Sequence, residues 1–315
     1  KSGARSTGLW IPDEAFASRN FVAGTNTLGG FLIQTDNLGD QFIELLRNRA
    51  QVLNLGARVL NLSRPTTIPR QNAAGATNWV AETTASTLGT GNFTQITLTP
   101  QAVSAYQQYS KQLLMENNPS IDALIRDDIT KQIALAIDLA ALHGTGSGQP
   151  TGIIATSGIG TINLATNGQA LTNTTAYPAM VSLESVVATA NADVGALAYL
   201  MRPSVRGQLK VQNRFANTDT PVWDTRMPDS PVNGYRAEVT NQIASNLTTG
   251  TATTICSAVF FGNWNDVILA QFGATDLTVD PYTYAQNGVV RILARRWIDV
   301  GVRHVGSFAV LGGVL

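Results

Sequence analysis

The sequence predicts an α+β fold, and three observations lead to that class. Residues 118–144 repeat apolar side chains at the three- and four-residue spacing of a helix. Residues 288–303 alternate apolar and polar side chains with the two-residue period of a strand. Between these two segments, helical and strand-like stretches follow one another without the regular repeat of a parallel, doubly wound sheet.

The composition of the 315-residue chain is that of a folded protein with few charges. Hydrophobic residues make up 44%, charged residues make up only 13%, and 21 basic residues balance 21 acidic ones. These values argue against a disordered chain and a basic nucleic-acid reader, and the single cysteine argues against a disulfide scaffold. Either Thr, Asn and Ser cover an ordinary domain surface, or neighbouring subunits bury much of it.

The first part of the chain is expected to form an arm, a helix and a strand. Residues 1–36 are aperiodic and contain several glycines, as in an extended arm, whereas 38–53 have helical spacing and 57–62 are strand-like. We find no charged-plus-apolar leader and no run of the ~18–20 apolar residues that span a bilayer. A soluble protein without a membrane partner is therefore expected.

Residues 63–100 are expected to form a long two-stranded arm. A strand-like lead-in at 66–70 and an alternating return strand at 93–100 enclose a stretch rich in Ala, Thr, Gly and Asn, in which Trp79 is a main apolar anchor. We place the tip near 89–91, where the sequence is Gly-Thr-Gly. Because an isolated hairpin is only marginally stable in water, this arm should lie against another surface, in this chain or another.

The helix at 118–144 is expected to carry its own start and stop signals. Asn118 can cap its first turn, Pro119 suits the first helical position, and Gly144 can end it in a left-handed conformation. His143 lies in the last turn, where a protonated imidazole would complement the helix dipole. At ~1.5 Å per residue the helix would be a rod of roughly 35–40 Å.

The glycine-rich loop at 144–152 marks a boundary, after which shorter elements follow. Helices are expected over 177–194, 203–212 and 264–272, and strands over 196–201, 235–243, 254–262, 288–303 and 308–311.

We find no constellation of residues that supports catalysis or ligand binding. No lysine follows the glycines at 144–152 as a phosphate loop requires, and a helix precedes that loop where a dinucleotide-binding fingerprint needs a strand. No His-x-x-x-His or Cys-x-x-Cys pair and no Gly-x-Ser-x-Gly elbow exist, and Cys256 lies in an apolar run typical of a buried thiol. The sequence thus predicts no catalytic residue, cofactor or metal, and a protein that is not an enzyme.

A series of short motifs gives the chain a family resemblance. In chain order they are GGFLI (29–33), IP (68–69), WVAE (79–82), FTQITLTP (93–100), SKQLL (110–114), DLAALHGTG (138–146), FGNW (261–264) and the strand at 288–302. In this order the chain resembles the major capsid proteins of tailed bacteriophages, which have the Hong Kong 97 fold. The resemblance covers about residues 29–311.

The resemblance implies a subunit of two domains with two extensions. The implied segments are an N-terminal arm (1–36), a peripheral domain (37–62, 101–150 and 275–315) with its spine helix at 119–143, an extended β-hairpin loop (63–100) and an axial domain (151–274). A chain beginning at Lys1 is similar to a mature product from which a scaffold segment has been removed.

The implied function is structural. Pentamers and hexamers would form an icosahedral shell around double-stranded DNA, which the neutral chain would hold without sequence readout. The protein would be a virion component assembled in the host bacterial cytoplasm, with a portal, a maturation protease and a cementing protein as possible partners. The lysines are Lys1, Lys111, Lys131 and Lys210, and none lies in 63–100, so no Lys–Asn isopeptide cross-link through the loop is expected.

Four residues of the extended loop are candidates for the subunit interface. Trp79 is expected to anchor the loop, because buried aromatics dominate interface energies, unless it packs within its own subunit. Arg70 and Glu82 are candidates for ion pairs between subunits, and Phe93 is the fourth candidate. Three alternatives stay open: an encapsulin-like nanocompartment shell, a secreted α/β binding module, and, least favoured, an enzyme.

Overall fold

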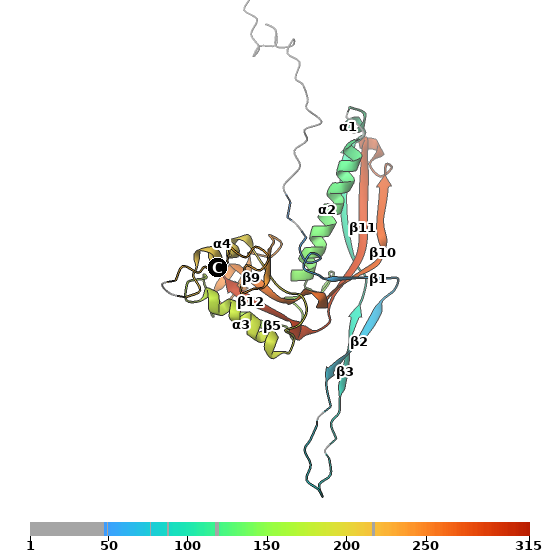
Figure 1. Ribbon diagram of the computed structural model, residues 1–315. Helices are drawn as coiled ribbons and strands as arrows, with labels where there is room; N and C mark the ends of the chain where they lie inside the picture. The colour runs from blue at the N-terminus through green and yellow to red at the C-terminus, as the bar shows by residue number, and fades with distance from the viewer. Residues whose placement is uncertain (1–46, 49, 76, 87, 117–119, 216–217) are drawn as a thin grey trace, which may run out of the picture. The chain divides into compact units, whose positions relative to one another are not determined.

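The computed structural model (Figure 1) describes residues 47–48, 50–75, 77–86, 88–116, 120–215 and 218–315. The helices are α1 (Lys111–Glu116), α2 (Ser120–His143), α3 (Ala176–Thr189) and α4 (Pro203–Val211), with short 3-10 turns η5 (Trp264–Asp266), η6 (Ala285–Asn287) and η7 (Val305–Ser307). The strands are β1 (Arg58–Leu62), β2 (Thr66–Ala73), β3 (Asn92–Leu98), β4 (Gln101–Ser110), β5 (Gly160–Asn163), β6 (Leu197–Met201), β7 (Arg236–Val239), β8 (Leu247–Thr249), β9 (Ala252–Asn263), β10 (Val267–Asp280), β11 (Val289–Val302) and β12 (Phe308–Val314).

The long helix α2 lies along a four-stranded sheet (Figure 1). The strand order is β1-β10-β11-β4, in which β1 runs parallel to β10 and the other pairs are antiparallel. Ile129 and Ile133 of α2 pack against Val290, Ile292 and Ala294 of β11, all of them buried. The helix predicted at 118–144 and the strand predicted at 288–303 are thus confirmed, and the first half of the strand buries its predicted apolar face against the helix.

A six-stranded sheet builds the second core. Its order is β5-β12-β9-β6-β7, with β8 paired to β9 outside this path. Helix α3 buries Met180, Leu183 and Val187 in a cluster with Tyr199 of β6 and Phe261 of β9. The helices predicted at 177–194 and 203–212 and the strands predicted at 196–201, 235–243 and 254–262 are all present, with slightly different ends.

Trp264 lies where the two sheets meet. Its side chain is fully buried, its indole N–H donates to the Ala198 carbonyl at 2.9 Å, and its ring meets Phe308 edge to face at 5.5 Å. The same apolar cluster includes Leu142 of α2 and Val300 of β11. One continuous core therefore joins both sheets to the end of the long helix.

Two of the predicted helices are wrong in the part that the structure describes. Of the helix expected over 38–53, residues 38–46 lie outside the described residues, and 47–48 and 50–53 are not helical. The amides of Gln51 and Val52 donate to Asp138 instead of to helical carbonyls. The segment 264–272 is a short turn followed by strand β10, because its apolar run is buried on both faces and periodicity cannot distinguish such a strand from a helix.

The end of α2 also differs from the prediction. Gly144 does not adopt a left-handed conformation. It is instead needed for close approach, because an added Cβ would lie 2.1 Å from the Pro150 carbonyl oxygen and 2.5 Å from that of Ala140. The proposed caps Asn118 and Pro119 lie outside the described residues.

Sheet membership crosses the expected domain boundaries at two places. Strand β10 begins at Val267 and belongs to the four-stranded sheet, although the expected axial segment runs to residue 274. Strand β12 pairs with β9 and β5 in the six-stranded sheet, although it lies within the segment 275–315 expected to be peripheral. Alternation of side chains identifies a strand, but the sheet that the strand joins depends on pairing across the chain.

Candidate subunit interface

The segment 63–100 forms the predicted two-stranded arm, and its base is packed. Strands β2 and β3 pair antiparallel from Thr66 opposite Leu98 to Ala73 opposite Asn92. Leu98 is fully buried in a cluster with Ile268, Ala270 and Phe272 of β10, against which Ile68 and Ile96 also pack. The base of the hairpin is therefore part of the core of the four-stranded sheet.

Polar contacts hold the same base in place. The guanidinium of Arg70 donates from Nε to the Thr94 hydroxyl at 3.0 Å and from Nη1 to the Arg303 carbonyl at 3.4 Å. The Thr99 amide donates to the Asp299 carboxylate at 2.7 Å. Burial raises the pKa of Asp299, although hydrogen bonds from the Thr99 and Val300 amides oppose the shift. These contacts fix the direction in which the hairpin leaves the sheet.

Apolar side chains are buried at the base of the hairpin and exposed farther out. Leu98 is 0% exposed and Ile96 is half-buried, but Phe93 is 71%, Leu88 85% and Trp79 105% exposed. In Figure 1 the hairpin extends away from the sheet that holds its base. Trp79 therefore does not pack within its own subunit among the residues that the structure describes.

The tip of the hairpin is not where the glycines suggested. Gly91 lies close to the Ala73 carbonyl and Gly75 lies close to the Gly89 carbonyl, so the two chains still run side by side there. The turn at the end of the arm is formed by residues 77–86, where the Thr84 amide donates to the Ala81 carbonyl at 3.0 Å. The predicted tip at 89–91 is wrong, because these glycines allow close approach of the two chains instead of reversing them.

The four predicted interface residues fall into two groups. Arg70 and Phe93 lie near each other on paired strands, where Arg70 is opposite Thr94. Trp79 and Glu82 lie together in the terminal turn, and both are exposed. Arg70 donates from Nε and Nη1 to groups of its own subunit, so these two hydrogen bonds stabilise the base of the hairpin. Leu88 is a further exposed apolar residue of the arm that the sequence analysis did not select.

His143 lies in the last turn of α2, as predicted. Its Nε2 accepts a hydrogen bond from the Ala244 amide at 3.1 Å, and its ring meets Phe260 edge to face. A nitrogen that accepts must be unprotonated, and burial lowers the pKa of His143 to about 4. At neutral pH the imidazole is therefore unprotonated, so the protonated form that would complement the helix dipole is not populated.

Metal binding and membrane spanning are two other possible roles. Within the described ranges, no group of three or more His, Cys, Asp or Glu side chains is placed to hold a metal ion. No helix in the described part of the chain has the length and apolar character needed to cross a membrane.

The model of the phage capsid family matches residues 29–313. The chain belongs to the phage capsid family. It is 29% identical over 314 residues to the major capsid protein of Halomonas phage phiHAP-1, with 98% of this chain and 48% of that protein covered. It is 24% identical over 305 residues to the major capsid protein of Klebsiella oxytoca phage phiKO2, covering 91% and 69%. The chain thus spans about half the length of the first relative.

Solved structures confirm the Hong Kong 97-type fold expected from the resemblance. The capsid chain of a native GTA particle has a TM-score of 0.74 and 18% identity, with 95% of this chain and all of that chain covered. A chain of Mycobacterium phage Ogopogo has a TM-score of 0.69 and 18% identity, with 90% and 98% covered. Sequences this different share the arrangement of sheets, long helix and hairpin, so family members can keep the fold while its contacts vary.

Proposed function

We propose that this member of the phage capsid family is a major capsid subunit whose copies assemble into a closed icosahedral shell around phage double-stranded DNA. One observation carries the proposal: the hairpin has a buried, hydrogen-bonded base and ends in a fully exposed tryptophan. An arm with a packed base and an exposed apolar end fits a part that completes its packing on another copy.

The energetics favour burial of the arm on a neighbour. A large aromatic side chain buries roughly 150–250 Å², which contributes about 4–6 kcal/mol at about 25 cal/mol per Å². Part of this gain is lost in ordering the tip and in the entropy of association. Because each shell subunit would both give and receive an arm, the small net gain per contact is repeated over every subunit.

The remaining contacts of the shell follow from the two-core architecture. Head-to-tail contacts close into rings when the rotation between copies permits, and we assign the pentamer and hexamer contacts to the segment around the six-stranded sheet. The net charge of zero supports DNA held by confinement and counterions, without sequence readout. Assembly in the host bacterial cytoplasm, with a portal, a maturation protease and a cementing protein as partners, completes this proposal.

Truncation of the anchor tests the proposal. Trp79→Ala should leave the subunit folded, because Trp79 packs against none of the described residues of its own subunit, but should reduce shell yield and the melting temperature of the shells. Trp79→Phe is the matched control and should retain most of the yield. Circular dichroism of the unassembled subunit and sedimentation of the assembled material separate the two effects. Wild-type shell yield and melting in Trp79→Ala would overturn the assigned role of the hairpin.

A further inference from the structure

The turn at residues 50–57 is packed into the junction between the two cores. Val52 and Leu55 are buried in the apolar cluster that joins both sheets to the end of α2. The turn closes on itself, because the Leu55 amide donates to the Gln51 carbonyl at 3.0 Å. Strand β1 begins only at Arg58. The turn can therefore open without breaking any strand pair.

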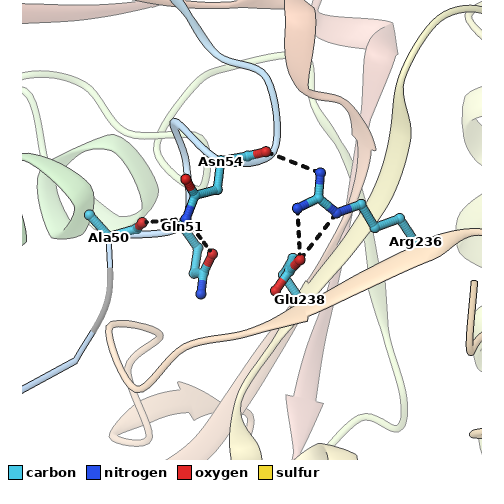
Figure 2. A network of polar contacts seen from close by, with 5 residues as sticks. All are labelled: Ala50, Gln51, Asn54, Arg236 and Glu238. Atoms are coloured by element: carbon cyan, nitrogen blue, oxygen red, sulfur yellow. Dashed lines mark hydrogen bonds and ion pairs between the residues drawn. The ribbon is translucent and has the colours of Figure 1, made fainter. Parts of the chain in front are cut away.

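One attachment of this turn is polar and partly exposed (Figure 2). The Asn54 carbonyl accepts from Arg236 of β7 at 3.1 Å, and the Asn54 side-chain amide donates to the side chain of Gln51 at 3.1 Å. Arg236 is also paired with Glu238 at 2.8 Å, and these two side chains are 48% and 29% exposed. Ion pairs as exposed as this one contribute little to stability. The network therefore orients the turn on β7, and the buried contacts decide whether the turn stays closed.

The other attachment is buried and depends on one carboxylate. The amides of Gln51 and Val52 donate to Asp138 Oδ1 of α2 at 3.1 and 2.9 Å. Asp138 is only 3% exposed, and its Oδ2 is buried without a hydrogen bond to any described residue. The charged carboxylate has thus lost the water around both oxygens and has gained partners for only one of them. The neutral acid loses less on burial, because it carries no charge out of water.

The charges on the neighbouring elements do not offset this burial. No residue of the turn at 50–57 is titratable, and β10 lines the space beneath α2 with uncharged side chains. From β11, Arg296 lines the same space, and the titratable residues of α2 closest in sequence to Asp138 are Lys131 and His143. Burial raises the pKa of Asp138, and the hydrogen bonds from the two amides of the turn oppose that shift. The closed turn therefore favours the protonated form of Asp138.

Opening of the turn reverses this preference. Once the amides of Gln51 and Val52 leave, water can reach Asp138, and a hydrated carboxyl group returns to its ordinary pKa of 3.8. The closed turn thus binds a proton more readily than the open turn does. By linkage, acid favours the closed turn, and this contribution to its stability is lost as the pH rises through the raised pKa of Asp138.

From these observations we propose that the turn at 50–57 is a proton-sensitive latch between α2 and β7, which closes when Asp138 binds a proton and loosens when Asp138 releases it. Opening withdraws Val52 and Leu55 from the cluster that joins the two sheets. The latch therefore couples proton binding to the connection between the two cores. The inference concerns the single subunit, and it stands or falls independently of the proposed shell.

Hydrogen exchange of the full-length, unassembled subunit tests the latch. The protection factor of a peptide covering residues 50–57 is measured by mass spectrometry from pH 4 to pH 8, with the intrinsic exchange rate divided out at each pH. In the wild type it should fall by up to about tenfold per pH unit until the raised pKa of Asp138 is passed, and then stay constant. The turn should also exchange faster than the buried part of α3, because a turn that opens only on global unfolding is not a latch.

Two matched variants identify the carboxylate. Asp138→Asn keeps an oxygen that can accept from both amides but cannot ionise, so the protection factor at 50–57 should become independent of pH. Asp299→Asn removes the other buried carboxylate that accepts two amides, at the base of the hairpin, and should leave the wild-type pH dependence of the turn unchanged. A flat wild-type profile, or a slope that persists in Asp138→Asn, would overturn the latch. If Asp138→Asn does not fold, the wild-type slope and its retention in Asp299→Asn still decide the question.

Discussion

The pH dependence of the free energy of unfolding tests how His143 packs at the end of the long helix. Its pKa is lowered by burial from 6.5 to about 4, and its Nε2 accepts from the Ala244 amide only while unprotonated. Between these two pH values the unfolded chain binds a proton that the folded chain does not. The free energy of unfolding therefore falls as the pH falls from about 6.5 to about 4, and the contribution is constant outside this window.

The size of this effect follows from the shift. One pKa unit corresponds to about 1.4 kcal/mol, so the depressed pKa of His143 costs the folded state at most about 3 kcal/mol at pH 4. Asp138 and Asp299 act in the opposite direction, because burial raises their pKa and their folded forms bind protons more readily than the unfolded chain. The pH profile of the wild type alone would therefore mix the two kinds of contribution.

The variant His143→Gln isolates the imidazole. A glutamine oxygen can accept from the same amide but does not titrate in this range. The free energy of unfolding of each unassembled subunit is measured with denaturant at pH 7 and at pH 4. Relative to the variant, the wild type should lose about 2–3 kcal/mol between these two pH values. If the two pH profiles run parallel, His143 does not carry a depressed pKa and the reasoning about its burial is refuted.

Three further substitutions test other parts of the fold. Gly144→Ala should lower the free energy of unfolding of the subunit by more than about 2 kcal/mol, because its Cβ would meet the Pro150 carbonyl. The control Gly207→Ala adds its Cβ in open space and should be neutral or slightly stabilising. Equal melting temperatures for the two variants would contradict this reasoning. Trp264→Phe should cost about 2–4 kcal/mol in chemical unfolding, because a buried carbonyl loses its donor and a cavity remains, and a cost below about 1 kcal/mol would refute its role at the junction. Asp299→Asn should weaken the anchoring of the hairpin base and speed limited proteolysis of the arm while the cores stay protected, and unchanged cleavage would argue against this anchor.

The elements best predicted from the sequence bury one face and expose the other. Helix α2 and the first half of strand β11 show clear periodicity because each buries one apolar face against the other. The helix prediction at 264–272 was wrong for the opposite reason. Val267 to Ala270 are buried on both faces of β10, so their side chains show no periodicity that identifies a strand. The helix prediction at 50–53 was wrong for a third reason. The amides of Gln51 and Val52 donate to the distant carboxylate of Asp138 instead of to carbonyls within a helix.

The interface could be predicted only in part. The sequence of 63–100 was enough to predict a long two-stranded arm with Trp79 as a main apolar anchor. The contact between Asp138 and the amides of Gln51 and Val52 could not be predicted, because these groups lie far apart in the chain and meet only in the folded subunit. A buried atom without a partner, such as Asp138 Oδ2, is visible only when all contacts around it are known.

Electron microscopy of the native protein, without cross-linker, tests the central claim most directly. The account predicts uniform closed icosahedral shells, in which density for the tip of each hairpin lies on a neighbouring subunit. A small shell enclosing protein cargo would instead indicate a nanocompartment. Monomers or small oligomers alone, under conditions in which the hairpin is intact, would contradict the assignment of this chain as a shell-forming capsid subunit.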